Sequence, residues 1–178
     1  MDEPLRLVSD LAPPEFEAAQ RSRDFENLVH AQHEGLYGAL CLLTRDRGEA
    51  EDLMQEAFLK VWERWDRVQD MDDPTGYLYR TALNLYRKRI RRASVAIRRA
   101  IGLGASRDSL AEAEARDAVV RALSALTPRQ RESIVLVDLL GYSSTEAGKV
   151  MGIKAATVRV LASQGRAALK RNAGETDE

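Results

Sequence analysis

The sequence is poor in cysteine and contains no long apolar run, and both absences restrict what the chain can be. Among its 178 residues, Cys41 is the only cysteine, which excludes an intramolecular disulfide and fits a reducing, cytoplasmic setting. No apolar stretch approaches the ~20 residues that a membrane-spanning helix requires. The N-terminus is acidic and lacks the pattern of a secretory signal. The remaining composition, 44% hydrophobic and 31% charged, is typical of a folded, helix-rich protein.

Motifs of enzyme chemistry are missing as well. The sequence shows no nucleophile constellation and no cluster with the spacing of metal ligands. His30 and His33 stand one helical turn apart, but no further ligand converges on them, so a packing or surface role is favoured. The carboxylates near residues 51–56 lie on an open helix face, which suits docking better than acid–base catalysis. We therefore expect no catalytic residue, no metal site and no cofactor, and hence no enzyme.

A long stretch without negative charge marks the first candidate site. The whole chain has a formal net charge of −1, yet residues 77–100 contain only positive charges. At helical spacing, Leu78, Ala82 and Leu85 form an apolar stripe that can pack inward. Another face offers cations, an amide and an aromatic ring, the groups that bind single-stranded nucleic acid. We therefore favour nucleic-acid binding over the alternative of a merely solvated basic helix. That face comprises Tyr77, Arg80, Asn84, Arg87, Lys88 and Arg91.

Hydrophobic periodicity predicts an all-α chain, with no convincing strand-like alternation. Asp24 is a plausible N-cap for a helix ending near Thr44, and a turn at 46–48 precedes a second helix, Glu49 to Trp65. An Asp-rich loop at 66–76 leads into the basic helix. We predict two small helical domains joined by a flexible linker. The predicted boundaries are an acidic N-terminal arm at 1–23, a first domain at 24–100, a linker at 101–116, a second domain at 117–172 and a tail at 173–178.

The second predicted domain opens with a strong helix signal. Thr127 suits an N-cap and Pro128 the first helical position, and the helix that they open is expected to stop at Gly141. Ser143 or Ser144 caps the next helix, and Glu146 has the spacing of a capping box if Ser143 is the N-cap. These signals place a further pair of helices in the C-terminal part of the chain.

That pair has the frame of a helix-turn-helix. Gly148 lets the two helices approach closely, Gly152 permits a positive φ in the turn, and Val158 locks the second helix onto the first. Many helical hairpins mimic this frame, but beside an independent basic helix it favours DNA binding. The outward positions of the second helix include Thr157, Arg159, Ser163, Gln164 and Arg166.

Three motifs, in order, resemble those of extracytoplasmic-function (ECF) sigma factors of the sigma-70 family. Glu49–Phe58 is similar to the family's A-E-D-L-x-Q-E-x-F signature in region 2.2. Tyr77–Asn84 resembles its W-L-Y-R-I-A-x-N in regions 2.3 and 2.4, with Tyr77 in place of the frequent Trp. Leu126–Glu132 resembles the L-P-x-R-Q-R-E opening of region 4. The resemblance covers residues 24–171.

The resemblance implies a division of labour. Asp52, Gln55 and Glu56 would dock on the β′ clamp helices of core RNA polymerase. The basic face and the loop before it would hold the separated non-template strand of the −10 element, with Asn84 contacting a base. The second domain would read the −35 element in promoter DNA and lean on the β flap. Matching the family's base-reading positions gives Arg159, Val160, Ser163 and Gln164.

The resemblance further implies an anti-sigma factor as a partner. It also implies that this chain is a bacterial cytoplasmic protein, which such a partner can hold at the membrane. Two departures stand out: the recognition helix is less basic than is common, and the acidic arm is not part of the usual pattern. The alternative is a stand-alone helix-turn-helix regulator of duplex DNA without a polymerase partner. The 49–58 motif favours the sigma factor, because a simple repressor has no use for that polar docking face.

Overall fold

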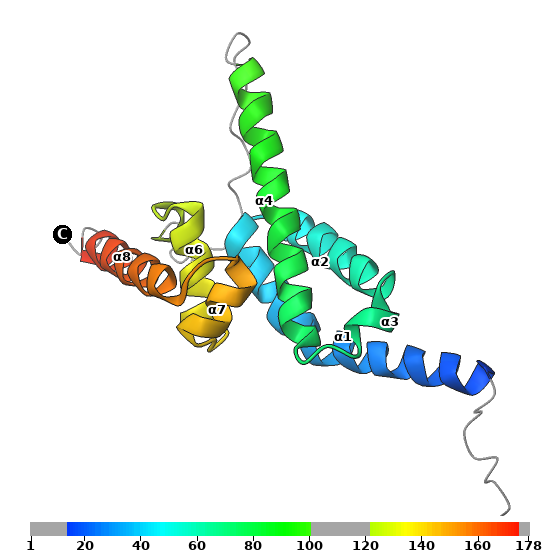
Figure 1. Cartoon of the computed structure of the whole chain (residues 1–178). Coiled ribbons are helices and arrows are strands. Elements are labelled where there is room, and N and C mark those ends of the chain that lie inside the picture. Colours follow the sequence, from blue (N-terminus) through cyan, green and yellow to red (C-terminus); the bar gives the residue numbers. More distant parts are fainter. Residues whose placement is uncertain (1–13, 101–121, 175–178) are drawn as a thin grey trace, which may run out of the picture.

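The computed structural model describes residues 14–100 and 122–174, with side chains over 19–93 and 122–171, and every regular element there is helical (Figure 1). The predicted linker at 101–116 lies outside the described residues, as do most of the predicted arm and tail. The elements are α1 (Pro14–Thr44), α2 (Arg47–Trp62), α3 (Trp65–Val68), α4 (Pro74–Ala100), α6 (Pro128–Ile134), the π-helix η1 (Val135–Leu139), α7 (Ser144–Met151) and α8 (Ala155–Gly174).

Helix α1 begins well before the expected start. Asp24 is not an N-cap, because the helix already begins at Pro14, and the Asp24 carboxylate accepts a hydrogen bond from Gln20 one turn earlier (3.0 Å). Tertiary contacts support the added turns: Arg21 pairs with Asp66 (2.8 Å), and its guanidinium lies 5.3 Å from the Trp62 ring centroid. The expected arm is therefore helical from residue 14 onward.

The boundaries between α2 and α4 also differ from expectation. Helix α2 begins at Arg47 with Asp46 as its N-cap and ends at Trp62, while Trp65 opens the short helix α3 and is buried. The segment from Pro74 to Gly76 starts α4 and does not belong to the preceding loop. Proline is favoured in a first turn, and the Asp73 carboxylate accepts a hydrogen bond from the Gly76 amide (2.7 Å).

The helix-turn-helix follows the local signals closely. Ser143 caps α7 in a reciprocal capping box with Glu146 (2.8 and 3.2 Å), and Gly152 has a φ of 69° in the turn. A Cβ added at Gly148 would lie 2.8 Å from the Ile153 carbonyl oxygen, so only glycine allows this approach. Val158, in α8, is fully buried in the same core cluster as Ala147 and Val150 of α7. These predictions are confirmed.

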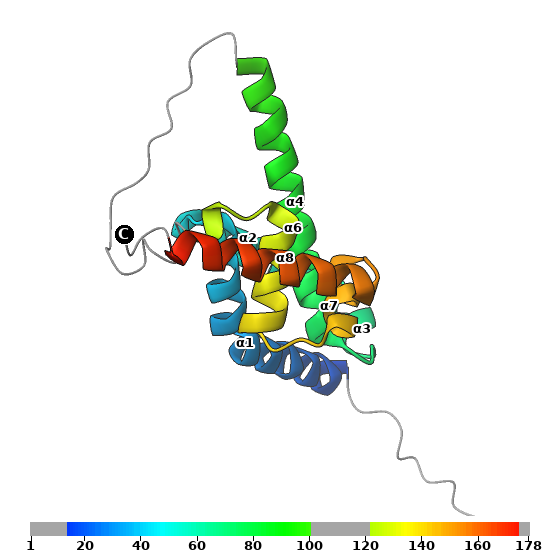
Figure 2. The ribbon, with the colours of Figure 1, turned by 90° about the vertical axis from the view of Figure 1, so that its left-hand side faces the viewer.

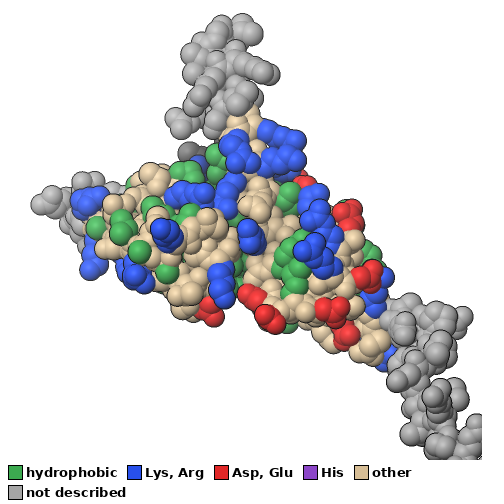
Figure 3. All heavy atoms as spheres, in the orientation of Figure 1, with side chains coloured by type: hydrophobic (Ala, Val, Ile, Leu, Met, Phe, Trp, Pro, Cys, Tyr) green, Lys and Arg blue, Asp and Glu red, His purple; other side chains and the backbone are tan. Residues whose placement is uncertain are grey.

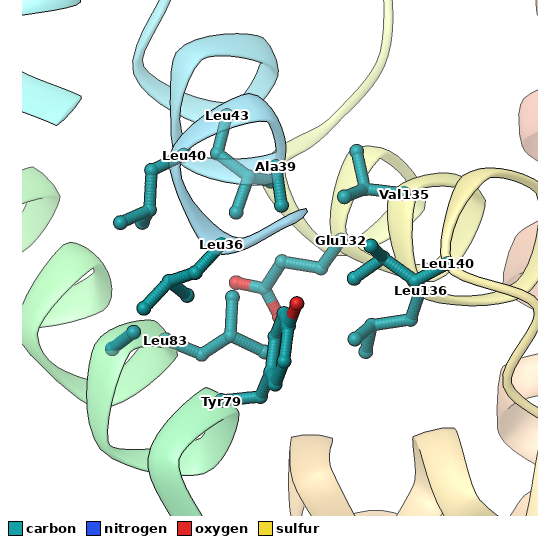
Figure 4. A pocket seen from close by; sticks show the side chains of 11 residues that line it. Leu36, Ala39, Leu40, Leu43, Tyr79, Leu83, Glu132, Val135, Leu136 and Leu140 are labelled. Carbon is teal, nitrogen blue, oxygen red and sulfur yellow. The ribbon is translucent and has the colours of Figure 1, made fainter. Parts of the chain in front are cut away.

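The helix that Thr127 and Pro128 open is capped as predicted but is not uniform. Thr127 forms a capping box with Gln130, and α6 passes at Val135 into the π-helix η1. Gly141 then adopts a φ of 71°, which lets the chain turn into the helix-turn-helix. The added residue in a π-turn shifts the side chains that follow, and it helps to place Leu136 and Leu140 against α1 and α4 (Figure 4).

The two domains pack together in one molecule. One buried cluster contains Leu36 and Leu40 from α1, Leu83 from α4, and Val135 and Leu136 from η1. Helix α7 lies against α4, and α8 crosses over α6, while the C-terminal half of α4 projects away from the rest (Figures 1 and 2). The all-α prediction is confirmed, and the core crosses the boundary between the predicted domains.

Candidate nucleic-acid interface

A cationic pocket of about 360 Å³ lies between α2 and α4. Five of the six residues predicted for the basic face line it together, and no acidic side chain does. In Figure 3, Lys and Arg side chains follow α4 and the neighbouring edge of α2. The lining consists of Lys60, Arg64, Tyr77, Arg80, Thr81, Asn84, Leu85, Lys88 and Arg91.

The pocket residues are held in place by the opposite face of α4. Leu78, Ala82 and Leu85 are buried as the periodicity predicts, while Arg80, Asn84 and Lys88 are exposed. At the rim, Arg64 donates a hydrogen bond to the Tyr77 hydroxyl (3.2 Å). That bond raises the pKa of Arg64, and it fixes the ring beside the cations. The site thus presents a ring, an amide and fixed positive charge to a polyanion.

Two lining residues escaped the sequence analysis. Lys60 and Arg64 come from α2 and its end, outside the basic segment that drew attention. Their spacing of four residues puts both on one side of a helix, which was an available signal. Only the packing of α2 beside α4 brings these cations to the same pocket.

Arg87 is the predicted site residue that does not line the pocket. It points to the second domain, where its Nε and Nη2 donate to the Glu132 carboxylate at 3.1 and 2.6 Å. The Arg87 side chain is only 15% exposed and that of Glu132 only 1%. Its remaining contact toward the pocket is a hydrogen bond from Nη1 to the Asn84 amide oxygen (3.3 Å).

The predicted polymerase-docking residues share the outer face of α2. Asp52 and Gln55 are exposed and Glu56 is half-buried beside Lys60, with 3.6 Å between the Glu56 carboxylate and the ammonium. One and two turns further along, Leu59 is 57% exposed and Trp62 is 37% exposed. This face therefore combines polar groups with two exposed apolar side chains.

Arg89 links that face to the basic helix. Its guanidinium lies 3.8 Å from the Glu49 carboxylate and 3.9 Å from that of Asp52. Burial raises the pKa of Glu49, and the Arg89 charge opposes the shift. Both contacts are long and partly exposed, so we expect them to orient Arg89 more than to stabilise the fold.

The six positions predicted for the recognition helix all lie at the surface of α8. Two of them have partners within the second domain. Gln130 donates to the Gln164 amide oxygen (3.4 Å), and Arg166 forms two hydrogen bonds to the Asp138 carboxylate (3.0 and 2.8 Å), which raise the pKa of Arg166. Val160 is 55% exposed, an apolar side chain free to meet a base edge.

Metal clusters and membrane-spanning helices are two features that the described residues lack. No group of three or more His, Cys, Asp or Glu side chains there could hold a metal ion. None of the described helices is long and apolar enough to cross a membrane. The pocket on α4 and the exposed helix α8 are the features on which a functional assignment can rest.

The fold and these surfaces define an all-helical protein with a helix-turn-helix and a cationic pocket. Two family profiles specify it further: sigma-70 region 2 matches residues 28–95, and sigma-70 region 4 matches residues 116–169. The chain belongs to the sigma-70 family and is an ECF-type RNA polymerase sigma factor. The alternative of a stand-alone regulator is not favoured, because region 2 is the half that a simple helix-turn-helix regulator lacks.

Individual relatives agree with the family profiles. The chain is 28% identical over 151 residues to the ECF RNA polymerase sigma factor SigM of Mycobacterium tuberculosis, with 84% of this chain and 77% of SigM covered. It is 30% identical over 162 residues to the ECF sigma factor SigE of Mycolicibacterium smegmatis, covering 82% and 60%. Both matches extend over most of this chain and so include both halves.

Solved structures share the fold. The sigma factor RpoE of Bartonella quintana, in complex with the anti-sigma factor NepR, superposes with a TM-score of 0.73 at 22% identity, covering 84% of this chain and 96% of that one. CnrH, in complex with the cytosolic domain of CnrY, gives a TM-score of 0.65 at 27% identity, covering 89% and 95%.

Proposed function

We propose that this sigma factor captures the separated non-template strand of the −10 element in the pocket between α2 and α4. The observation that carries the proposal is the lining itself: five cations, an amide and a tyrosine ring converge there without an acid. Cations hold phosphates, and each base stacked on an aromatic ring contributes about 1–3 kcal/mol toward the cost of unpairing. The protein binds and orients DNA in this role and makes or breaks no bond itself.

Two further surfaces complete the proposed division of labour. The outward side of α8 reads the −35 element as duplex, and the second domain leans on the β flap. The outer face of α2, with Asp52, Gln55 and Glu56, docks on the β′ clamp helices. The exposed Leu59 next to them supports this role, since an apolar side chain within a polar rim is typical of a protein interface. The proposed domains keep the predicted limits, 24–100 and 117–172, with the turns of α1 from Pro14 onward added to the first.

An anti-sigma factor is the proposed inhibitory partner. RpoE of Bartonella quintana, whose fold this chain shares, was solved with the anti-sigma factor NepR. A partner of this kind would cover the polymerase- and DNA-binding surfaces, and a membrane-bound one would hold the sigma factor at the membrane. Co-purification of the tagged chain from its native cells, followed by mass spectrometry, tests this proposal.

Run-off transcription tests the −10 assignment. Purified core polymerase is combined with wild type, the double variant Asn84→Ala/Lys88→Ala, or the control Arg67→Ala, which removes an exposed cation outside the pocket. We expect the double variant to bind core polymerase normally and to lose at least about tenfold in open-complex formation, since it loses a base contact and a phosphate contact. Normal opening by the double variant would contradict the assignment. Absence of any wild-type transcript would contradict promoter recognition as a whole.

A further inference from the structure

Helix α8 turns one side to the second domain and the other to the solvent. Val158, Ala162 and Gly165 are buried, and α8 packs on α6 and α7. Successive residues of an α-helix are rotated by about 100°, so the side opposite these three is centred on positions 156, 160, 163 and 167. Figure 2 shows α8 lying across the near side of the molecule. This outward side of α8 is therefore the one that a helix-turn-helix inserts into the major groove.

The centre of the outward side is an uncharged ridge of small side chains. All four of its residues are exposed: Ala156, Val160, Ser163 and Ala167. Val160 is the largest of them and is 55% exposed. A single exposed valine is ordinary on a protein surface. This one is unusual in its place, because it occupies the middle of the helix face that meets the bases, where long hydrogen-bonding side chains are the common readers.

The larger polar side chains of α8 lie beside the ridge or are already bonded. Arg159 stands on one flank, rotated by about 100° from the valine that follows it. Arg166 donates two hydrogen bonds to the Asp138 carboxylate of η1, at 3.0 and 2.8 Å. Gln164 accepts a hydrogen bond from Gln130 of α6 (3.4 Å). Cations at the side of an inserted helix suit the phosphates that border the groove, which leaves base edges to the ridge.

The four bases present different chemistry to such a ridge. Their major-groove edges carry hydrogen-bond donors and acceptors, and thymine alone adds a methyl group. An apolar side chain pressed onto a donor or acceptor removes its water without replacing the hydrogen bond, which costs free energy. Contact between Val160 and a methyl group instead removes apolar surface of both from water, which is favourable. The side chain of Val160 therefore discriminates in favour of thymine.

We propose that Val160 recognises the methyl group of a thymine, and that the −35 element of this sigma factor has a thymine in the base pair that Val160 meets. This proposal rests on the proposed function, in which α8 reads the −35 duplex. Ala156 and Ala167 are small, so the helix can approach the bases closely along the ridge. The Ser163 hydroxyl, on the same ridge, can donate to or accept from a neighbouring base. Val160 is thus a specificity-determining residue that selects its base without a hydrogen bond.

Deoxyuridine provides the test, because it differs from thymidine only in lacking that methyl group. A promoter fragment identified by run-off transcription is prepared with each thymine of its −35 element, on either strand, replaced singly by deoxyuridine. Holoenzyme is assembled from core polymerase and wild type, Val160→Ala or the control Leu139→Ala. The control truncates another exposed apolar side chain of the second domain, 54% exposed and outside α8. Competition binding then gives the ratio of affinities for the thymine and deoxyuridine fragments.

We expect one deoxyuridine to weaken wild-type binding about fourfold, the factor that corresponds to burial of one methyl group. Val160→Ala should lose this discrimination and Leu139→Ala should keep it.

Equal wild-type affinity for thymine and deoxyuridine at every position overturns the proposal, as does discrimination that persists in Val160→Ala. If Val160→Ala instead weakens binding to core polymerase and leaves the affinity ratio unchanged, Val160 faces a protein and does not read a base. Wild-type holoenzyme that binds a scrambled −35 element as tightly as the original contradicts the proposed function of α8 as well. Dependence on the −35 element without dependence on its methyl groups overturns the role of Val160 alone.

Discussion

At the scale of single residues, Arg131 is the most deeply buried cation in the described part of the chain. It is 6% exposed and donates to three backbone carbonyls, those of Leu43, Leu123 and Leu126, at 2.9 to 3.2 Å. Carbonyl groups near helix ends lack intrahelical donors, and the planar guanidinium can serve several of them together. Arg131 thereby connects α1, α6 and the segment before α6, although it makes no contact expected of a DNA-binding residue.

Replacement of Arg131 should destabilise the protein strongly. Arg131→Met removes three buried hydrogen bonds to backbone carbonyls, and we expect a loss of about 3 kcal/mol in the free energy of unfolding. Urea denaturation followed by circular dichroism measures the loss. Arg129→Met is the matched control on the same helix; its side chain is 45% exposed, so the loss should stay below about 1 kcal/mol. Equal losses in the two variants would mean that the carbonyl contacts of Arg131 contribute little.

At the scale of elements, glycine has opposite effects in two helices. Gly148 in α7 sits against the turn, where an added Cβ would meet the Ile153 carbonyl oxygen at 2.8 Å. Gly38 lies inside α1, and an added Cβ there would meet nothing within 4 Å. Glycine is required in the first place because two backbones approach closely. At Gly38 the glycine only adds conformational entropy to the unfolded chain.

The same substitution at these two glycines should therefore change stability in opposite directions. Gly148→Ala forces the helix and turn apart and should cost about 1–3 kcal/mol. Gly38→Ala should stabilise by about 0.5–1 kcal/mol, since alanine is the better helix former. Urea denaturation of both variants gives the comparison. A neutral or stabilising Gly148→Ala would show that the turn relaxes freely around a methyl group.

At the scale of the whole molecule, three tyrosines near the contact between α4 and the second domain make the free energy of unfolding sensitive to high pH. Burial raises the pKa of Tyr79, Tyr86 and Tyr142 above 10.0, the ordinary value, and for Tyr86 the Arg131 charge opposes part of the shift. The folded chain thus retains these protons more firmly than the unfolded chain. The stability that this contributes is complete below pH 10.0 and is lost as the pH rises from there toward the folded pKa values.

We therefore expect the free energy of unfolding to fall as the pH rises above about 10. Tyr142→Phe keeps the ring contact and removes one of the ionisable groups, so its stability should decline less steeply. Urea denaturation at several pH values between about 9 and 11 measures both slopes. Parallel slopes for wild type and Tyr142→Phe would contradict a contribution from this tyrosine.

The sequence by itself determined much of the local structure, although not the start of α1, the end of α2 or the π-helix η1. The capping boxes at Thr127 and Ser143 and the glycine at 152 depend on neighbours within a few residues, so they could be recognised from spacing. The apolar stripe and the basic face of α4 could be predicted from the helical periodicity, because that too depends only on residues close in sequence. The family motifs then indicated a sigma factor, although caps and periods alone would have left the regulator hypothesis open.

Only the tertiary structure decided which charges line the pocket and which lie between the two domains. Arg87 and Glu132 are 45 residues apart, and Arg131 reaches a carbonyl 88 residues away. In the sequence, Arg87 is indistinguishable from the cations around it, and Lys60 from any surface lysine. Their roles differ because long-range packing buries one beside a carboxylate and brings the other to the pocket. The free energy of a charge depends on its surroundings, and those surroundings exist only in the folded molecule.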